Sequence, residues 1–268
     1  MPTYVITGAR GGIGLEYVNQ LSRDPSNTVI ALVRSTSTAA SAALSALESI
    51  RSSSSATTHI IECDVSSEAS IAGLPGRLSA ALGPGMAKVD FLINNAATLQ
   101  YAHQTSLTLD AEGLDVQMNT NVLGPARIVQ VLLPFLGAAA ASEGEGEGQG
   151  EGQGAVEEEE RIAAVVANIT SGAGSLGWAS DGRVHMLGGY SISKAALNML
   201  TVQQAKELKS KGIVAVAVDP GHVKTASGGL GATVEVEDSA RSILHLLAGL
   251  NSTDTGRFFL YNGTCVPW

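Results

Sequence analysis

Cysteine and basic residues are scarce in this sequence, and each scarcity excludes a class of protein. Cys63 and Cys265 are the 2 cysteines among 268 residues, and they lie too far apart for a disulfide framework or a zinc-finger spacing. We therefore expect a reducing, cytoplasmic setting. Four histidines show no metal-ligand spacing either, so no metal site is predicted. These histidines are His59, His103, His185 and His245.

Long apolar runs and basic clusters are also missing. No segment approaches the run of about 18 apolar residues that a membrane-spanning helix needs, and we see no charged leader of a secretion signal. Lys and Arg number 16 against 25 Asp and Glu, without a basic patch that would bind nucleic acid. Neither a membrane nor a nucleic acid is an expected partner. The hydrophobic share of 44% is sufficient for a buried core.

The net charge of −9 comes from one segment, SEGEGEGQGEGQGAVEEEE at residues 142–160. It contains 8 Glu and no Lys or Arg, so removing its charge from −9 leaves −1. A repeat of Glu, Gly and Gln buries little side chain and loses much backbone entropy on folding, so we predict a disordered acidic insertion at 137–160. A solvated surface insertion is our interpretation, and an acidic docking segment is the alternative.

The rest of the chain alternates between strand-like and helix-like segments. Strands are expected at 3–8, 28–33, 58–65, 89–97, 161–170, 213–221 and 256–263, and helices at 12–23, 39–50, 119–136, 191–210 and 237–250. The strands are continuously apolar, which indicates a parallel sheet covered by helices on both faces. Residues 1–268 are therefore predicted to form a single α/β domain with a doubly wound sheet. The insertion joins a helix to a strand, at the edge opposite the one where such sheets bind ligands.

A glycine-rich loop, TGARGGIG at residues 7–14, joins the first strand to the first helix. Its spacing, Gly8-x3-Gly12-x-Gly14, differs from the G-x-G-x-x-G dinucleotide motif. The physical purpose would be the same: a tight turn, close approach of the backbone to a pyrophosphate, and a helix N-terminus directed at the anion. Glycines at a strand-to-helix turn also serve packing, and that alternative stays open.

Arg34 follows the second strand, and Arg10 lies within the glycine loop. Dinucleotide-binding domains that prefer NAD place an acid after the second strand to hold the ribose 2′-hydroxyl, whereas an arginine suits the 2′-phosphate of NADP. The two arginines therefore favour NADP(H) over NAD(H). The alternative for each is a solvated surface arginine.

Tyr190 and Lys194 stand four positions apart in a helical segment, so their side chains share one face. An ordinary tyrosine has a pKa near 10 and is a poor base at pH 7. An ammonium at about 4 Å, with an effective dielectric of about 20, contributes roughly 4 kcal/mol, or about three pKa units. We therefore expect Lys194 to lower the pKa of Tyr190 and the phenol to exchange a proton with a substrate. A buried tyrosine beside a snorkelling lysine is the alternative.

Six short segments occur in order across most of the chain. They are TGARGGIG (7–14), NNAA (94–97), NVLG (121–124), NITSGAGS (168–175), YSISK (190–194) and DPGHVKT (219–225). Together they resemble the short-chain dehydrogenase/reductase superfamily. DPGHVKT and the final GRFFLYNGTCVPW are similar to the fungal norsolorinic acid ketoreductase-like proteins and the sniffer-like carbonyl reductases. The resemblance implies a Rossmann-type fold and hydride transfer with NADPH/NADP+.

The resemblance also implies four catalytic residues. Tyr190 corresponds to the general acid/base and Lys194 to its partner. Ser171 corresponds to the serine that hydrogen-bonds the substrate oxygen, and Asn121 to the asparagine that holds a proton-relay water. Ser171 lies 19 positions before Tyr190, wider than is usual in the family, so we expect an enlarged active-site loop at 176–189. Ser175 remains a second candidate for the serine role.

The cofactor contacts implied by the resemblance include adenine contacts, ribose contacts and a segment that holds the nicotinamide carboxamide. They are Gly8, Arg10, Gly12, Ile13, Gly14, Arg34, Asp64, Val65, Asn94, Ala96, Tyr190, Lys194, Pro220, Gly221, Val223 and Thr225. Ala97 replaces the last glycine of the family's usual NNAG. We also expect apolar walls and a substrate contact near the site, with core packing or loop stabilisation as the alternatives. These further residues are Leu99, Trp178, Met186, Leu187 and His222, with a mobile lid at 225–233.

These patterns predict an NADPH-dependent reductase that acts on a small carbonyl compound, a hydrophobic ketone or aldehyde of polyketide type by resemblance. A homo-oligomer is left open. Two other functions are weighed: a non-catalytic NADP(H)-binding sensor or scaffold, and an epimerase or dehydratase of extended relatives. The intact set of four catalytic residues disfavours the sensor. The chain length and the glycine spacing disfavour the epimerase.

Overall fold

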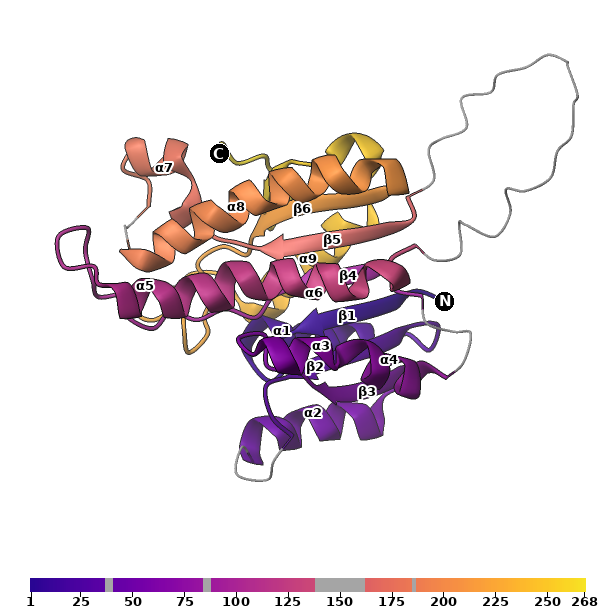
Figure 1. Ribbon diagram of the computed structural model, residues 1–268. Helices are drawn as coiled ribbons and strands as arrows, with labels where there is room; N and C mark the ends of the chain where they lie inside the picture. Colours follow the sequence, from indigo (N-terminus) through magenta and orange to yellow (C-terminus); the bar gives the residue numbers. More distant parts are fainter. Residues whose placement is uncertain (37–40, 84–87, 138–161, 185–186) are drawn as a thin grey trace, which may run out of the picture.

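The computed structural model in Figure 1 describes residues 1–36, 41–83, 88–137, 162–184 and 187–268. Apart from Gly137, the insertion expected at 137–160 lies outside these residues, so its predicted disorder stays a prediction. His185 and Met186 lie outside them as well. Within the described ranges, no helix has the length and apolar character needed to cross a membrane.

Seven strands form one sheet in the order β3-β2-β1-β4-β5-β6-β7, and every neighbouring pair is parallel. The strands are β1 Thr3–Thr7, β2 Thr28–Val33, β3 Thr57–Glu62, β4 Phe91–Asn94, β5 Ala164–Ile169, β6 Ile213–Asp219 and β7 Phe258–Leu260. The chain runs outward from β1 to β3 and then returns to place β4 beside β1. Ligands of such sheets bind outside the carboxyl ends of the strands at this reversal. The predicted doubly wound parallel sheet is confirmed.

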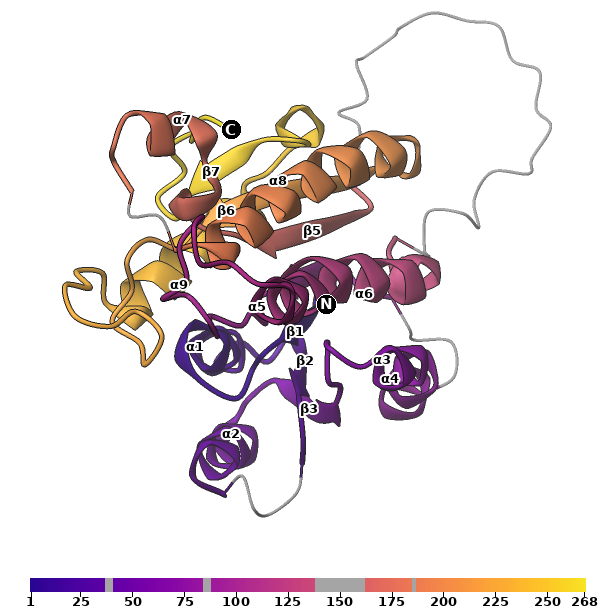
Figure 2. The same ribbon diagram turned by 60° about the vertical axis from the view of Figure 1, so that its left-hand side comes forward.

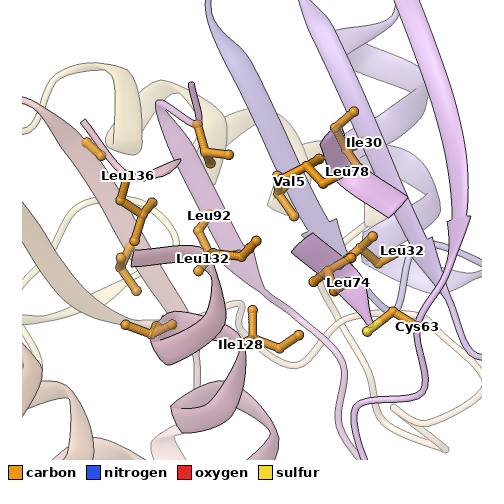
Figure 3. Packing of buried hydrophobic residues seen from close by; sticks show 14 of the residues in the cluster. Val5, Ile30, Leu32, Cys63, Leu74, Leu78, Leu92, Ile128, Leu132 and Leu136 are labelled. Atoms are coloured by element: carbon orange, nitrogen blue, oxygen red, sulfur yellow. The ribbon is translucent and has the colours of Figure 1, made fainter. Parts of the chain in front are cut away.

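Helices cover both faces of the sheet (Figure 2). They are α1 Gly12–Leu21, α2 Ser41–Ser53, α3 Glu68–Ala72, α4 Leu74–Leu82, α5 Ala111–Met118, α6 Gly124–Leu132, α7 Leu176–Ser180, α8 Gly189–Leu208 and α9 Val236–Ala248. One core cluster joins the sheet to α4, α6 and α8, and Figure 3 shows part of it, including Val5, Leu78 and Leu132. The other joins the opposite face to α1, α2 and α9, where Ile6, Tyr17 and Ile243 are fully buried. Val5 and Ile6 enter different clusters because successive strand residues point to opposite faces.

The central strands are buried along their whole length, as a sheet covered on both faces requires. Every residue of β2, β5 and β6 is buried. Their sequences, TVIALV, AVVANI and IVAVAVD, therefore contain the continuous apolar runs from which the parallel sheet was predicted. Apart from β2, whose bounds match, the expected strands are longer than the observed ones. The residues after Asn94 and Leu260 leave the sheet to form loops at its carboxyl edge.

One expected helix is interrupted. The segment predicted as a continuous helix at 119–136 contains a π-helical turn, Asn119–Leu123, before α6 and a 3-10 turn, Leu133–Phe135, after it. A π turn inserts an extra residue into the helical ladder and redirects side chains locally, and such turns are frequent at functional sites. The short helices α3, α4, α5 and α7 were not predicted, because five to nine residues carry little periodicity.

Candidate active site at the carboxyl edge of the sheet

The glycine loop has a backbone that side chains would obstruct. Gly8 and Gly12 adopt positive φ angles of 67° and 54°. A Cβ on Gly8 would lie 2.8 Å from the Ala96 Cα, and one on Gly14 would lie 2.4 Å from the Gly8 oxygen. By contrast, a Cβ on Gly11 would meet nothing within 4 Å. Gly11 is the N-cap of α1 and makes no side-chain cap bond, so no side chain of that residue caps the first N–H groups of the helix. This cradle fits a phosphate group.

Arg10 and Arg34 follow the carboxyl ends of the neighbouring strands β1 and β2. Arg34 is exposed and Arg10 is partly exposed. Neither makes an ion pair with another residue of the described chain. The acid that ends β3, Glu62, accepts hydrogen bonds from the Thr36 amide and hydroxyl, both at 2.9 Å. Two cations without an ion-pair partner among the described residues therefore lie at the edge where a 2′-phosphate would bind.

The segment after β3 is fixed by local hydrogen bonds. The Asp64 carboxylate accepts from the Ser66 amide at 2.9 Å and from its hydroxyl at 2.7 Å. Val65 is buried against α6, where a Cβ on Gly124 would lie 2.9 Å from the Val65 oxygen. Asp64 and Val65 are thus held at the carboxyl edge of β3, on the side of the sheet where the resemblance implies adenine contacts.

Asn94 and Asn95 have different partners. The Asn94 amide donates to Asn168 on β5 at 2.9 Å, so it cross-links two strands. The Asn95 side chain instead donates to the backbone oxygen of Thr7 at 3.1 Å and lies beside Gly8. The Thr7 hydroxyl accepts from the amides of Asn95 and Ala96, both at 2.9 Å. The sequence did not single out Thr7 or Asn95 as site residues, although Thr7 begins TGARGGIG and Asn95 is the second asparagine of NNAA.

Asn121 lies in the π turn and is completely buried. Its amide donates to the Thr98 oxygen at 3.0 Å and to the Ser193 hydroxyl at 2.9 Å, and its oxygen accepts from the Thr98 amide at 2.8 Å. The Ser193 hydroxyl in turn donates to the Tyr190 backbone oxygen at 2.8 Å. Asn121 therefore links the loop after β4 to the first turn of α8. Its role in holding a relay water stays a prediction.

Tyr190, Lys194 and Ser171 come together at the carboxyl edge. Tyr190 and Lys194 lie on the first turns of α8, and Ser171 follows β5. The Lys194 ammonium donates to the Ile169 backbone oxygen at 2.8 Å and lies 5.6 Å from the centroid of the Tyr190 ring. The side chains of Ser171 and Tyr190 are hydrogen-bonded to one another. Three of the four side chains that the resemblance implies to be catalytic therefore form one cluster.

The expected lowering of the Tyr190 pKa by Lys194 is wrong in this structure. The pKa of Tyr190 is raised to about 12, chiefly by burial and also by the negative charge of Asp219, against the lowering effect of the hydrogen bond with Ser171. Burial also lowers the pKa of Lys194 to about 7, against the opposing effect of Asp219. The calculation from charge spacing assumed a permanently charged ammonium and omitted desolvation, which is the larger effect for both groups.

Asp219 is a further member of this cluster that the sequence reasoning did not single out. It ends β6 and is 7% exposed, and its carboxylate accepts from the Gly221 amide at 2.9 Å. Burial raises the pKa of Asp219, whereas the amides of Gly221 and Gly172 and the charge of Lys194 lower it. The signal was present in the sequence: an acid directly at the end of a wholly apolar strand is rarely buried without a partner.

Ser175 has a structural role outside this cluster. It is completely buried, its hydroxyl donates to the Pro267 oxygen at 2.6 Å, and it accepts from the Trp178 amide at 3.0 Å as the N-cap of α7. The Gly177 amide donates to the Trp268 oxygen at 2.9 Å. Ser175 therefore connects α7 to residues 267 and 268, and the geometry favours Ser171 as the serine of the cluster.

The residues expected to line a pocket differ in their surroundings. Trp178 packs beside Phe258 and Val266, so core packing describes it better than a pocket wall. Leu99, which follows β4, and Leu187, three positions before Tyr190, are partly exposed. The extra residues before Tyr190 contain α7, which Figure 1 places at the same edge as the first turn of α8.

The turn after β6 approaches the glycine loop. Gly221 has a φ of +82°, and the Pro220 oxygen accepts from the Ser239 hydroxyl at 2.8 Å. Val223 is buried and forms a β-bridge with Val234. Thr225 lies next to the glycine loop, since a Cβ on Gly12 would be 3.3 Å from its methyl group.

His222 stabilises the loop that follows, because its ring Nε2 is hydrogen-bonded to the Gly228 oxygen at 2.6 Å. This bond supports the loop-stabilising alternative for that residue. The expected mobility of 225–233 stays a prediction. Among the residues that the structure describes, no three His, Cys, Asp or Glu side chains form a group that could hold a metal ion.

Comparison with known proteins reveals close relatives. The family model "short chain dehydrogenase" matches residues 2–146 and 153–230. The chain is 36% identical to the "C-signal" protein of Myxococcus xanthus over 180 residues, which cover 67% of this chain and 93% of that protein. It is 31% identical to the short-chain dehydrogenase/reductase atnB of Arthrinium sp over 234 residues, covering 84% of this chain and 76% of that protein.

Two solved structures are similar over their full length. The NADPH-bound carbonyl reductase from chicken fatty liver has a TM-score of 0.84 and 28% identity, with 100% of this chain and 99% of that chain covered. The carbonyl reductase Sniffer of D. melanogaster has a TM-score of 0.79 and 26% identity, with both chains covered completely. The fold, the ordered motifs and the family match lead to one conclusion: the chain belongs to the short-chain dehydrogenase/reductase family of oxidoreductases.

Proposed function

We propose that this protein is an NADPH-dependent reductase that converts a ketone or aldehyde into an alcohol, with Tyr190 as the proton donor. The observation that carries the proposal is the cluster of Tyr190, Ser171 and Lys194 at the carboxyl edge of the sheet, beside a glycine loop that leaves an open helix N-terminus. In a doubly wound sheet this edge is where a dinucleotide binds.

The cofactor is NADP(H). The phosphate cradle at Gly8–Gly14 suits a dinucleotide that carries a third phosphate, and so do Arg10 and Arg34, which form no ion pair within the described ranges. The NADPH-bound carbonyl reductase from chicken fatty liver, similar over the whole chain, supports the same assignment. The adenine, ribose and carboxamide contacts named from the sequence are proposed as the rest of the site. NADPH supplies the hydride that reduces the carbonyl carbon.

Tyr190 is suited to donate a proton and poorly suited to accept one. Because burial raises its pKa to about 12, the phenol stays protonated at neutral pH. A carbonyl oxygen that gains negative charge during reduction becomes basic enough to take this proton. The protonated phenol is the form that the reductive direction requires.

Ser171 holds the same oxygen. Its hydroxyl is bonded to Tyr190, so a carbonyl oxygen next to the phenol is also within reach of the serine. A second hydrogen bond to the developing oxyanion stabilises the transition state more than the ground state. Lys194 holds α8 to β5 through the Ile169 oxygen, and it contributes positive charge when protonated.

We propose a hydrophobic carbonyl compound, of polyketide type, as the substrate. Leu187 lies three residues before Tyr190, and Leu99 follows Thr98, whose backbone is hydrogen-bonded to Asn121. Both leucines are partly exposed, so they can contact an apolar ligand. The similarity to carbonyl reductases supports the reaction class.

The test is oxidation of NADPH by the purified protein with a panel of aromatic and aliphatic ketones. We expect turnover with at least one hydrophobic ketone, and a loss of about 10²–10⁴-fold in kcat for Tyr190→Phe. NADPH binding, measured by fluorescence, should stay close to that of the wild type. Undiminished turnover in Tyr190→Phe would overturn the mechanism.

A non-catalytic NADP(H)-binding protein is the second candidate function, and the similarity to a relative named "C-signal" is the observation that favours testing it. It makes a different prediction in the same assay. NADPH would bind to the wild type and to Tyr190→Phe, and neither protein would turn over any carbonyl compound in the panel.

A further inference from the structure

Asp219 is a buried carboxylate that the proposed reaction does not use directly. It stands at the last position of β6, 7% exposed, and its backbone oxygen accepts from the Tyr261 amide at 2.7 Å. An ionised carboxylate in such a position is costly unless hydrogen bonds and an opposite charge compensate it. Its partners therefore indicate why it is there.

Two backbone amides hold the carboxylate, and they belong to different loops. Oδ1 accepts from the Gly221 amide at 2.9 Å, in the turn after β6. The Gly172 amide, which follows Ser171 directly, is the second donor. A Cβ on Gly172 would lie 2.9 Å from Oδ2 of Asp219 and 2.8 Å from the Trp178 ring. Gly172 is thus confined between the carboxylate and the indole.

The same carboxylate lies near the cation of the cluster. Lys194 donates to the Ile169 oxygen of β5 at 2.8 Å, and Ile169 pairs with Val218, the residue before Asp219. The neighbouring Ser171 and Asn121 are neutral. Tyr190, on its own helix, is protonated at neutral pH because its pKa is raised to about 12. Within the described part of the chain, Asp219 is therefore the charged group that acts on Lys194.

We propose that Asp219 is a positioning residue of this site: its carboxylate joins the Ser171 loop to the Gly221 turn and provides the counter-charge of Lys194. The Asp219 side chain thereby has two effects on the site. The hydrogen bonds set where Ser171 lies relative to the turn after β6, and the charge keeps Lys194 protonated at higher pH than burial alone would allow. The inference rests on the proposed roles of Ser171, Tyr190 and Lys194.

The first experiment separates charge from hydrogen bonding in the cofactor-free protein. Asp219→Asn keeps an acceptor oxygen but removes the charge, whereas Asp219→Ala removes both. The Lys194 titration is followed by NMR of protein labelled in the lysine side chains, with the signal assigned through Lys194→Met. We expect the Lys194 midpoint to move to lower pH by at least about one pH unit in Asp219→Asn. An unchanged midpoint would overturn the counter-charge.

Hydrogen exchange of the Gly172 and Gly221 amides tests the connection between the loops. Asp219→Asn keeps one acceptor oxygen, so protection should persist at one of the two amides, whereas Asp219→Ala should lower protection at both, by at least about tenfold. Equal protection in the two variants would contradict the positioning role. Asp115→Asn is the control for charge removal, because Asp115 is exposed on α5 and should change neither measurement.

A reciprocal variant covers the case in which the Asp219 variants fold poorly. Interacting titratable groups shift one another, so Lys194→Met should raise the pKa of the Asp219 carboxyl, read from aspartate carboxyl resonances. If that resonance titrates as in the wild type, the pairing is wrong. None of these measurements needs turnover. Their failure is therefore distinct from failure of the proposed reductase, which the Tyr190→Phe assay decides.

Discussion

The Lys194 ammonium donates to the Ile169 backbone oxygen at 2.8 Å and lies 5.6 Å from the Tyr190 ring centroid, so the lysine is anchored to β5 while it covers one face of the phenol. Burial is the main effect on both side chains, raising the pKa of Tyr190 to about 12 and lowering that of Lys194 to about 7. At neutral pH the phenol is therefore protonated and the lysine is only partly protonated, which has consequences for stability as well as for catalysis.

Stability should depend on pH through Lys194. A lysine in the unfolded chain has a pKa near 10.4, whereas Lys194 in the folded protein has a pKa of about 7. Between these values the unfolded state binds one more proton, so this residue makes the free energy of unfolding rise with pH. Denaturant unfolding at pH 7 and pH 9.5 should therefore show a smaller increase in Lys194→Met than in the wild type. Identical increases in the two proteins would contradict the lowered pKa.

The two candidate serines should give opposite phenotypes. Ser171→Ala removes a hydroxyl that is bonded to Tyr190, and we expect kcat to fall about 10²–10³-fold with little change in melting temperature. Ser175→Ala removes the N-cap of α7 and its bond to Pro267, which should cost about 0.5–2 kcal/mol of stability. Kinetics and thermal melting of both variants test this. A larger loss of kcat in Ser175→Ala would reverse the assignment.

Arg34 should select NADPH over NADH. Replacing Arg34 by Ala removes a cation that has no ion-pair partner among the described residues, and NADPH should bind at least about tenfold more weakly. NADH binding should change little, because it lacks the 2′-phosphate. Arg23→Ala is the matched control, since Arg23 is exposed after α1, at the opposite end of that helix from the glycine loop. Equal weakening of both dinucleotides would reject a 2′-phosphate contact.

Two glycines of the loop should tolerate alanine very differently. A Cβ on Gly14 would lie 2.4 Å from the Gly8 oxygen and 2.6 Å from the Asn95 amide nitrogen, whereas one on Gly11 meets nothing within 4 Å. We expect Gly14→Ala to lose about 1–3 kcal/mol of stability through overpacking. Gly11→Ala should lose at most about 1 kcal/mol as an N-cap change. Urea unfolding of both variants measures the loss of stability. Equal losses would mean that the loop can shift to accept a side chain.

The acidic insertion should be dispensable for the reaction. Its flanks meet at the amino edge of the sheet: Val89, just before β4, pairs with Leu136, and a Cβ on Gly137 would lie 2.7 Å from that of Ala163. A short Gly-Ser linker in place of 138–161 can therefore join the flanks. We expect unchanged kcat and KM, measured with a carbonyl substrate found in the panel. A change in KM would instead support a contact between the insertion and the substrate.

Much of the fold could be predicted because its signals are local. β2 and β6 are continuous apolar runs in the sequence, because a strand of a sheet that is covered on both faces buries the side chains of both faces. The glycine loop was equally readable, since Gly8 and Gly12 adopt backbone conformations that other residues rarely adopt. Short helices such as α3 and α7 lack enough turns to show a period.

The site was only partly predictable. The four-residue spacing of Tyr190 and Lys194 and the order of the motifs are properties of the chain, and the sequence by itself determined that these two residues belong to one site. The tertiary structure decided what surrounds them: Asp219 from β6 and the Ile169 oxygen from β5. It also decided that the Ser175 hydroxyl is hydrogen-bonded to the Pro267 oxygen. The direction of both pKa values depends on desolvation and on charges brought together from distant segments, and neither can be read from spacing along one helix.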